Sequence, residues 1–439
     1  MTIKISRFSP LQGTIAIPGD KSITHRAFIL AAIAKGKSII THFSNCSDCT
    51  STAKILQKLG VSFQYESKTV KDRLIITGIS NIEQFLHVND FLDCENSGTT
   101  ARLMLGMLSA IPSSYTLNGD ESLIRRPMKR VTDPLQKMGA DFSFSDRTGC
   151  LPVQITGKKQ LRECNFTLNV ASAQVKSAML IAAAHAKSAL KIVSPWLLRD
   201  HTERLLKKMG APIIFDNMDI NLKPDSVLEG CEINIPGDFS SAAFFIARAA
   251  VEPGSRIIIK NVGLNQTRTA FLNILRRMGS EIRILNFFND SFEPYGDIEI
   301  RGARLKATDL MPEEIPALID EIPVIAFAMA CADGVSNVSG ATELRIKESD
   351  RISAIVREFS KFNVKIIEKH DGFIIDGPSK FVSPDKPFIH NDHRIVMTAS
   401  IMATMADGTT EIQNTEAADV SYPSFFTDLD LFRENPQTP

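Results

Sequence analysis

The sequence Ile17-Pro-Gly-Asp-Lys-Ser22 occurs a second time, with one change, as Ile235-Pro-Gly-Asp-Phe-Ser240. The separation of 218 residues is half of the 439-residue chain, and each copy precedes a segment rich in alanine and other apolar residues. Pro-Gly marks a chain reversal, so each copy predicts a strand, a turn and then a helix. A duplicated domain is the simplest explanation, with the chain crossing between the two copies at these turns.

A shorter pattern recurs within each half. An apolar helical segment with basic residues near its end is followed by Gly or Asn, which supports a left-handed helix C-cap. The five copies end at Gly60, Gly139, Gly210, Gly279 and Asn363. They are spaced 69 to 84 residues apart, and the apolar-periodic segment Ser424 to Phe432 suits a sixth helix. Six similar α/β units, three in each domain, therefore fit the length.

These repeats predict the domain boundaries. We expect one domain of residues 20–236 and a second of residues 1–19 plus 237–439, both of class α/β. The strand from Gly13 to Ile17 then belongs to the second domain, although it precedes the first along the chain. The cleft between two such domains is the default place for a ligand.

Composition excludes several classes of protein. Fifty basic and fifty acidic residues, 44% hydrophobic content and a mean hydropathy near zero indicate a globular chain with no overall field for nucleic acid or an anionic membrane. The N-terminus has no apolar leader and no apolar run approaches about 20 residues, so we expect a cytoplasmic protein. Seven scattered cysteines argue against a disulfide framework. Cys46-Ser-Asp-Cys49 has metal-ligand spacing, but no second Cys/His pair completes a site, and no metal is expected.

The first Pro-Gly turn has the features of an anion site. Lys21, Ser22 and Arg26 fall in the first turns of the expected helix, where backbone N–H groups and the helix dipole also favour an anion. This is not a P-loop, because Ile15 stands where the upstream glycine is required. Lys21 has Phe239 as its counterpart in the second copy, so we expect one copy to be chemical and the other structural. The alternative is an ordinary turn with solvated charges.

Further donor groups occur at helix starts or in loops of the same half. They are Asn96, Gly98 and Arg102, the loop residues Arg125 and Arg126, Ser172, Gln174 and Lys176, and Arg199. Each one alone is typical of an ordinary N-cap or a solvated loop. Their regular recurrence favours a site for phosphate and carboxylate groups, which guanidinium binds through two parallel hydrogen bonds.

The second half adds acids beside cations. Asp320 lies between two apolar runs, where a carboxylate is costly unless it has a partner, and such acids are candidates for proton transfer. If residues 345–351 form one helix, Lys347 and Arg351 share a face and Glu348 lies next to Arg351. The alternative for this segment is a surface ladder of ion pairs, which contributes little.

Together these motifs resemble the 5-enolpyruvylshikimate-3-phosphate synthases. In chain order the resemblance rests on Pro18-Gly-Asp-Lys-Ser22, Asn96-x-Gly-Thr99, Arg126-Pro127, Ser172-Ala-Gln174, Arg345-x-Lys-Glu-Ser-Asp-Arg351 and Asn391-Asp-His-Arg394. It implies a two-domain inside-out α/β barrel of six βαβαββ units, with the active site in the interdomain cleft. It further implies that no metal or organic cofactor is used. Separately, we expect a monomer.

The resemblance also implies a reaction in the biosynthesis of chorismate and aromatic amino acids. The enolpyruvyl group of phosphoenolpyruvate is transferred to the 5-hydroxyl of shikimate 3-phosphate, and phosphate is released by addition and elimination through a tetrahedral intermediate. Domain 20–236 would be the shikimate 3-phosphate side. The other domain would be the phosphoenolpyruvate and acid–base side.

Site residues carry over from the same motifs. Asp320 is implied as the base for the hydroxyl, Glu348 as the proton donor to the enol carbon, and Lys21 as an aid to phosphate departure. The residues implied for shikimate 3-phosphate are Lys21, Ser22, Arg26, Ser172, Ala173, Gln174, Arg199, Asp320 and Lys347. The residues implied for phosphoenolpyruvate are Lys21, Asn96, Gly98, Arg126, Gln174, Arg351, His393 and Arg394.

Two positions depart from the pattern of the family. The motifs at Ser172–Lys176, Arg199–Glu203 and Asn265–Arg268 resemble class II members, some of which tolerate glyphosate and carry Ala where this chain has Gly98. The response to glyphosate is therefore left open. Near the C-terminus, Val420 stands where class I members have a lysine that contacts phosphoenolpyruvate.

Two alternative functions make different predictions. The sister enzymes that use UDP-N-acetylglucosamine usually have Asn after the first lysine and a reactive Cys in the loop before Arg-Pro. This chain has Ser22 after Lys21 and no Cys from Gly119 to Pro127. A non-catalytic module that binds phosphorylated metabolites would need the cations but not Asp320 and Glu348.

Overall fold

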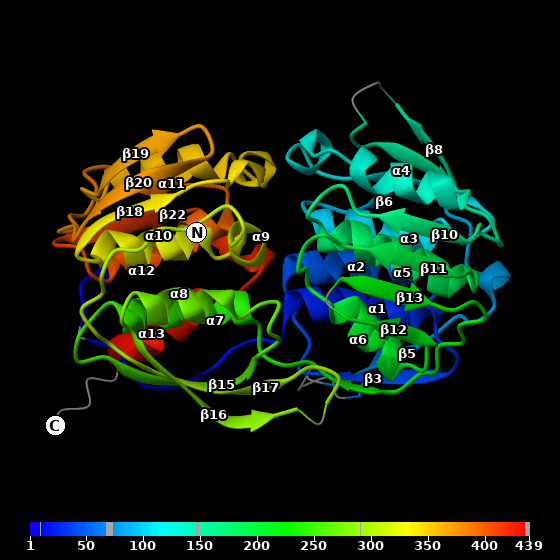
Figure 1. Ribbon diagram of the computed structural model, residues 1–439, viewed down its shortest axis with the longest axis horizontal. Helices are drawn as coiled ribbons and strands as arrows, with labels where there is room; N and C mark the ends of the chain where they lie inside the picture. Colours follow the sequence, from blue (N-terminus) through cyan, green and yellow to red (C-terminus); the bar gives the residue numbers. More distant parts are fainter. Residues whose placement is uncertain (9, 67–72, 146–148, 217, 290, 435–439) are drawn as a thin grey trace. The chain divides into compact units, whose positions relative to one another are not determined.

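The computed structural model describes residues 1–439 except 9, 67–72, 146–148, 217, 290 and 435–439. The chain forms two compact units, each of them α/β (Figure 1). The terminal unit comprises Met1–Pro18 and Gly237–Pro439, and the central unit comprises Gly19–Pro236. Gly19 therefore belongs to the central unit, one residue earlier than the expected boundary.

The central unit alternates strands and helices. Its elements are α1 (Lys21–Ile33), β3 (Lys37–Thr41), α2 (Ser47–Lys58), β4 (Ser62–Tyr65), β5 (Arg73–Thr77), η1 (Ile82–Gln84), β6 (Leu92–Asp93), α3 (Gly98–Leu108), β7 (Ser114–Asn118), η2 (Leu123–Arg125), α4 (Lys129–Met138), β8 (Asp141–Phe144), β9 (Val153–Thr156), β10 (Cys164–Thr167), α5 (Ala173–Ala186), β11 (Leu190–Val193), α6 (His201–Lys208), β12 (Ile213–Phe215), β13 (Asp219–Leu222) and β14 (Glu232–Asn234).

Three four-stranded sheets form the outer layer of the central unit. Their strand orders are β14-β3-β5-β4, β6-β7-β9-β8 and β10-β11-β13-β12. In the second sheet, β6 is parallel to β7 and is joined to it through α3, whereas β9 runs antiparallel to both β7 and β8. The third sheet has the same pattern. Each sheet with its helices is thus one βαβαββ repeat.

The terminal unit is built on the same plan. Its elements are β1 (Thr2–Ser6), β2 (Gln12–Ala16), α7 (Phe239–Ala250), β15 (Arg256–Gly263), α8 (Ala270–Arg277), β16 (Glu281–Phe288), β17 (Tyr295–Arg301), α9 (Ile315–Leu318), α10 (Ile322–Cys331), β18 (Gly334–Val338), η3 (Thr342–Ile346), α11 (Arg351–Ser360), β19 (Lys365–Lys369), β20 (Gly372–Gly377), β21 (Phe388–Ile389), α12 (His393–Ala403), β22 (Thr409–Gln413), η4 (Thr415–Val420) and α13 (Phe425–Glu434).

Its sheets are ordered β16-β17-β15-β2, β18-β20-β19 and β1-β22-β21. An isolated parallel bridge from Leu310 to Val338 takes the place of a first strand in the second sheet. In the third sheet the N-terminal strand β1 pairs antiparallel with β22, from Thr2 opposite Gln413 to Ser6 opposite Thr409. The prediction of six α/β repeats, three in each unit, is confirmed.

The two Pro-Gly copies exchange strands between the repeats. Strand β2 precedes α1 in the chain but pairs in parallel with β15, with Ile15 opposite Ile259. Strand β14 precedes α7 but pairs in parallel with β3, with Ile233 opposite Ile40. The expectation that the strand near Gly13 belongs with the second half is therefore confirmed.

Helices fill the interior of each unit, inside its layer of strands (Figure 1). In the central unit, α1, α3 and α5 pack against their neighbours and are buried over most of their length. In the terminal unit, α7, α10 and α12 do the same. Helices that are apolar on nearly every side must be surrounded by protein, which gives the inside-out arrangement.

The predicted helix ends are also confirmed. Gly60, Gly139, Gly210, Gly279 and Asn363 all have positive φ values, between 66° and 110°. Each one follows the C-terminal end of a helix, where the left-handed conformation satisfies the last carbonyl groups. In the described part of the chain, no helix combines the length and the apolar character that crossing a bilayer requires.

Candidate active site

The start of α1 presents Lys21 as its first residue. Asp20 caps the helix by accepting a hydrogen bond from the Ile23 amide at 2.8 Å. A Cβ atom on Gly19 would lie 1.7 Å from the His42 carbonyl oxygen, so only glycine fits before the cap. The Lys21 ammonium lies 2.9 Å from Oδ2 of Asp48, a residue for which the sequence predicted no role. The Pro-Gly-Asp sequence therefore sets the position of the lysine.

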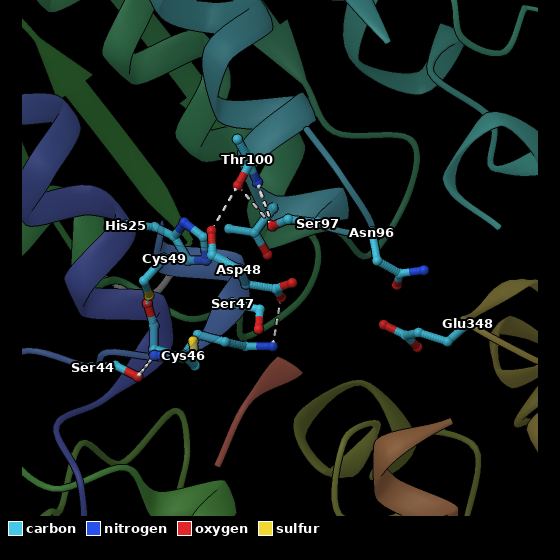
Figure 2. Close-up of polar contacts among 12 residues, drawn as sticks. His25, Ser44, Cys46, Ser47, Asp48, Cys49, Asn96, Ser97, Thr100 and Glu348 are labelled. Atoms are coloured by element: carbon cyan, nitrogen blue, oxygen red, sulfur yellow. Dashed lines mark hydrogen bonds and ion pairs between the residues drawn. The ribbon is translucent and has the colours of Figure 1, made fainter. Parts of the chain in front are cut away.

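A buried network fixes the neighbouring start of α2 against α3. The Thr100 hydroxyl is hydrogen-bonded to the Asp48 carbonyl at 3.2 Å and to Ser97 at 2.8 Å (Figure 2). Thr52 connects Thr100 to His25 of α1 through contacts of 2.8 and 2.7 Å. Burial holds the pKa of His25 well below its usual value, and the nearby Lys21 and Arg26 lower it further, so the ring is neutral.

Arg26 lies one turn farther along α1 and is buried. Its guanidinium donates to Thr202 Oγ1 at 2.8 Å, to Ser177 Oγ at 2.9 Å and to the Ser22 carbonyl at 2.8 Å. These contacts join α1 to α5 and α6. Ser22 itself is half-buried. Arg26 thus positions the first turn of α1, in addition to any role toward a ligand.

The start of α3 gathers a second group of predicted residues. Arg126 donates to Asn96 Oδ1 at 3.0 Å, and Asn96 donates to Asp120 Oδ2 at 2.6 Å. A methyl group on Gly98 would lie 3.1 Å from Nη1 of Arg126 and 3.3 Å from Nη1 of Arg102. The guanidinium groups of Arg126 and Arg102 therefore both lie next to Gly98, which has no side chain to keep them away.

Gln174 joins this group through Arg102. Arg102 donates to Gln174 Oε1 at 2.6 Å, and Gln174 donates to Thr99 Oγ1 at 3.0 Å. Ser172 caps α5 by accepting from the Val175 amide at 3.4 Å, and Ala173 is the first helical residue. Arg102 was recognised in the sequence as a donor at a helix start, but no specific role was predicted for it. Arg199 lies in the loop between β11 and α6.

In the terminal unit, three arginine side chains surround the carboxylate of Asp320. It lies between α9 and α10, and its side chain is 19% exposed. Its carboxylate is 3.8 Å from Arg351 Nη1, 3.6 Å from Arg394 Nη2 and 4.0 Å from Arg268 Nη1. Arg394 also donates to the Asp320 carbonyl at 2.8 Å. The expectation that this acid requires cationic partners is confirmed.

Glu348 shares one of these partners. Its Oε2 accepts from Arg351 Nη2 at 2.5 Å. The predicted pairing of Glu348 with Arg351 is correct, but the single helix assumed for residues 345–351 is wrong. Helix α11 begins only at Arg351 because Asp350 caps it, accepting from the Ser353 amide at 3.1 Å. Lys347 is extended and lies outside the helix, so it does not share a helical face with Arg351.

Asp392 holds Arg351 from the other side. It caps α12 by accepting from the Arg394 amide at 3.0 Å, and it also accepts from Arg351 Nε at 2.8 Å and Ser349 Oγ at 3.0 Å. Burial alone would raise the pKa of Asp392, but the charge and hydrogen bond of Arg351, together with His393, outweigh burial and lower it. His393 follows as the first, buried residue of α12. Asp392 lies within the motif Asn391–Arg394, but the sequence predicted no role for it.

Arg268, like Asp48, Arg102 and Asp392, had no role predicted from the sequence. It donates to Ser240 Oγ at 2.6 Å, and Ser240 donates to Glu321. The signal was present, because Arg268 closes a motif that marked the class II subtype. Phe239, the counterpart of Lys21, is buried edge-on against Phe271. Phe239, the first helical residue after the second Pro-Gly copy, thus has a structural role in the core, as expected.

The C-terminal departure from the family pattern, Val420, is half-buried and lies beside a buried aromatic residue. Val420 ends η4, and Tyr422 is fully buried against Phe245 and Phe425. Burial raises the pKa of Tyr422 well above its usual value. Among the described residues, this segment supplies aromatic packing and contains no lysine.

Comparison with known proteins agrees with this arrangement. Residues 5–429 match the family model described as EPSP synthase (3-phosphoshikimate 1-carboxyvinyltransferase). A 3-phosphoshikimate 1-carboxyvinyltransferase of Carboxydothermus hydrogenoformans is 45% identical, covering 97% of both chains, and one of Lactiplantibacillus plantarum is 44% identical, covering 97% of this chain and 98% of its own. A solved EPSP synthase of Acinetobacter baumannii superposes with a TM-score of 0.85 at 34% identity, covering 98% of both chains. The chain belongs to the EPSP synthase (3-phosphoshikimate 1-carboxyvinyltransferase) family.

Proposed function

We propose that this chain transfers the enolpyruvyl group of phosphoenolpyruvate to the 5-hydroxyl of shikimate 3-phosphate and releases phosphate. The observation that carries the proposal is that one buried guanidinium, that of Arg351, contacts both candidate proton-transfer groups. Its Nη1 is 3.8 Å from Asp320 and its Nη2 is 2.5 Å from Glu348. Family membership over residues 5–429 supports the same reaction.

In the proposed addition step, Asp320 accepts the proton of the 5-hydroxyl while Glu348 donates a proton to the methylene carbon of the enol. Protonation makes C2 of the enolpyruvyl group cationic, and the hydroxyl oxygen attacks it to give a tetrahedral intermediate. In the elimination step, a carboxylate removes a proton from the new methyl group and the carbon–phosphate oxygen bond breaks. Positioned acids and bases typically contribute about 10²- to 10⁴-fold to such steps.

The proposed ligand sets follow from the charges of the substrates. Both substrates carry phosphate and carboxylate groups, which suit the forked donors of arginine. For shikimate 3-phosphate we propose Lys21, Ser22, Arg26, Ser172, Ala173, Gln174, Arg199, Asp320 and Lys347. For phosphoenolpyruvate we propose Lys21, Asn96, Gly98, Arg126, Gln174, Arg351, His393 and Arg394. Lys21, whose ammonium is oriented by Asp48, would also stabilise the departing phosphate.

The test is phosphate release from phosphoenolpyruvate by the purified protein. It is measured with shikimate 3-phosphate, with UDP-N-acetylglucosamine, and with neither. We expect release with shikimate 3-phosphate alone. Release with the nucleotide sugar alone would assign the chain to the sister activity, and no release in any arm would favour a module that binds phosphorylated metabolites without catalysis.

A monomeric state and a cytoplasmic location are parts of the proposal that stay predictions from the sequence. Sedimentation equilibrium of the purified chain measures the first, and fractionation of the source cells measures the second. A dimer in solution would contradict the first prediction without affecting the proposed reaction.

A further inference from the structure

Two cysteines meet at the first turn of α2. Cys46 is the N-cap residue and Cys49 is the third helical residue, so the pair has the Cys-X-X-Cys spacing of redox-active motifs (Figure 2). Both are reduced and buried, with exposed fractions of 0% and 1%. The pair takes no part in the chemistry proposed above.

The same turn of α2 contacts Lys21 at its backbone carbonyl and at its side-chain ammonium. The Cys49 thiol donates to the Lys21 carbonyl at an Sγ–O distance of 3.6 Å. The Lys21 ammonium is paired with Asp48, the residue between the cysteines, at 2.9 Å. Any change in the conformation of residues 46–49 is therefore transmitted directly to Lys21.

The two thiols differ in acidity in the way that disulfide exchange requires. Burial would raise the pKa of Cys46, but the neighbouring Cys49 side chain, the charge of Lys21 and the Ser44 side chain together outweigh it, and the pKa is lowered. Burial raises the pKa of Cys49 well above the usual value, and its contact with Cys46 raises it further. Since the thiolate is the nucleophile, Cys46 is the residue that reacts first.

We propose that Cys46 and Cys49 form a reversible disulfide when a hydroperoxide is present, and that this disulfide lowers the activity by displacing Lys21. In the first step the sulfur of Cys46 attacks one peroxide oxygen, the O–O bond breaks, and water leaves after protonation. Cys46 is thereby oxidised to a sulfenic acid and hydrogen peroxide is reduced. In the second step the sulfur of Cys49 attacks that of Cys46, the S–O bond breaks and a second water leaves. Two thiols and one hydrogen peroxide thus give one disulfide and two waters.

The disulfide removes the hydrogen bond that holds the Lys21 carbonyl. An oxidised Cys49 has no S–H group to donate, and its sulfur must turn toward Cys46 to meet the geometry of a disulfide. Asp48 lies between the two bonded residues, so its carboxylate moves with the turn. Displacement of a catalytic group by about 1 Å can cost on the order of 100-fold in rate.

The bond itself is tested by mass spectrometry, independently of any activity. The wild-type protein is treated with hydrogen peroxide, alkylated under denaturing conditions and digested. We expect a peptide in which Cys46 and Cys49 are unalkylated and which is lighter by two hydrogen atoms, and we expect dithiothreitol to restore alkylation. If both residues remain alkylatable, or are oxidised only to sulfinic or sulfonic acid, the proposal is wrong.

The effect on turnover rests on the proposed function, and it is measured as phosphate release before and after oxidation. We expect oxidised wild-type protein to lose roughly 10- to 100-fold in kcat/KM, with recovery in dithiothreitol. The variants Cys46→Ser and Cys49→Ser should each keep their starting activity under peroxide. The matched control Cys231→Ser removes a half-buried thiol elsewhere in the central unit and should remain as sensitive as the wild type.

The outcomes separate the two proposals. A disulfide that forms in a protein without any phosphate release would contradict the proposed reaction and leave the redox site standing. Equal loss of activity in the wild type and in both cysteine variants would overturn the redox proposal while leaving the reaction intact. Thermal unfolding of each variant, compared with the wild type, identifies any variant that has simply lost its fold.

Discussion

The ammonium of Lys21 lies 2.9 Å from Oδ2 of Asp48, and these side chains are only 16% and 9% exposed. One residue begins α1 and the other lies in the first turn of α2, so the contact links two helix starts. A lysine in this position has its charge oriented before any ligand arrives. Such preorganisation reduces the entropy that binding must otherwise overcome.

This contact gives the first prediction. Asp48→Asn keeps the shape of the side chain but removes its charge, so Lys21 loses its orientation and kcat/KM should fall by roughly 10- to 100-fold. Asp141→Asn is the matched control, because Asp141 pairs with Lys158 at the same 2.9 Å on the surface, where such pairs contribute little. Unchanged kcat/KM in Asp48→Asn would show that Lys21 is held by other contacts.

The second prediction concerns the proposed base. Asp320→Asn should lower kcat by about 10²- to 10⁴-fold, because the amide cannot accept the hydroxyl proton. The KM for phosphoenolpyruvate should change much less, because Asp320 is proposed as a ligand of shikimate 3-phosphate and not of phosphoenolpyruvate. Glu314→Gln, which alters a surface pair with Arg277 in the same unit, is the control and should turn over normally. Normal turnover of Asp320→Asn would remove Asp320 from the mechanism.

A third prediction follows from the space around Gly98. A methyl group there would meet the ends of Arg126 and Arg102 at 3.1 and 3.3 Å, so both side chains must shift by a few tenths of an ångström. Gly98→Ala should therefore raise the KM for phosphoenolpyruvate by about 10-fold, equivalent to about 1.4 kcal/mol. The KM for shikimate 3-phosphate is the internal control. A proportional rise in both KM values would indicate a general distortion of α3.

The fourth prediction concerns the buried ion pair of Lys176 and Glu203, 2.5 Å apart and 3% and 1% exposed. Lys176→Met leaves Glu203 buried without its countercharge, which typically costs about 3–5 kcal/mol in the free energy of unfolding. The double variant Lys176→Met/Glu203→Leu should recover most of this loss. Urea unfolding of both variants measures the difference. Equal stability of the single and double variants would show that water reaches the carboxylate.

The fifth prediction concerns acid stability. Burial lowers the pKa of His185 to about 4, and a hydrogen bond from its Nδ1 to the Met107 carbonyl only partly offsets this. In the unfolded chain the pKa is about 6.5, so between these values the unfolded state binds the additional proton. The free energy of unfolding should fall as the pH drops through this window, by no more than about 3 kcal/mol, since the residue is only half-buried.

His185→Gln should remove this part of the pH dependence. Urea unfolding near neutral pH and again at the acidic end of the window compares it with the wild type and with His87→Gln, which changes an exposed histidine. Identical pH dependence in His185→Gln and the wild type would assign the acid sensitivity to other groups.

Local sequence signals were sufficient to predict the repeated architecture. Helix ends were predictable because a left-handed C-cap favours Gly or Asn, whatever the distant contacts. The positions that meet this requirement are Gly60, Gly139, Gly210, Gly279 and Asn363. The duplicated Pro-Gly-Asp sequence likewise predicted two capped helices and the exchange of β2 into the terminal unit. Donor residues at helix starts were visible for the same reason, because capping and anion binding use local backbone groups.

The partners of the buried charged residues, in contrast, became apparent from the packed fold and not from the sequence. Asp48, Arg268 and Asp392 lie 27, 52 and 41 residues from their partners Lys21, Asp320 and Arg351, and no local periodicity links such positions. The start of α11 at Arg351 was not predicted from the sequence. Asp350 can cap a helix only if the backbone turns at that residue, and the turn depends on how α11 packs. Short-range backbone preferences therefore fixed the elements of this fold, whereas the pairing of buried charges depended on contacts that form only when distant helices pack together.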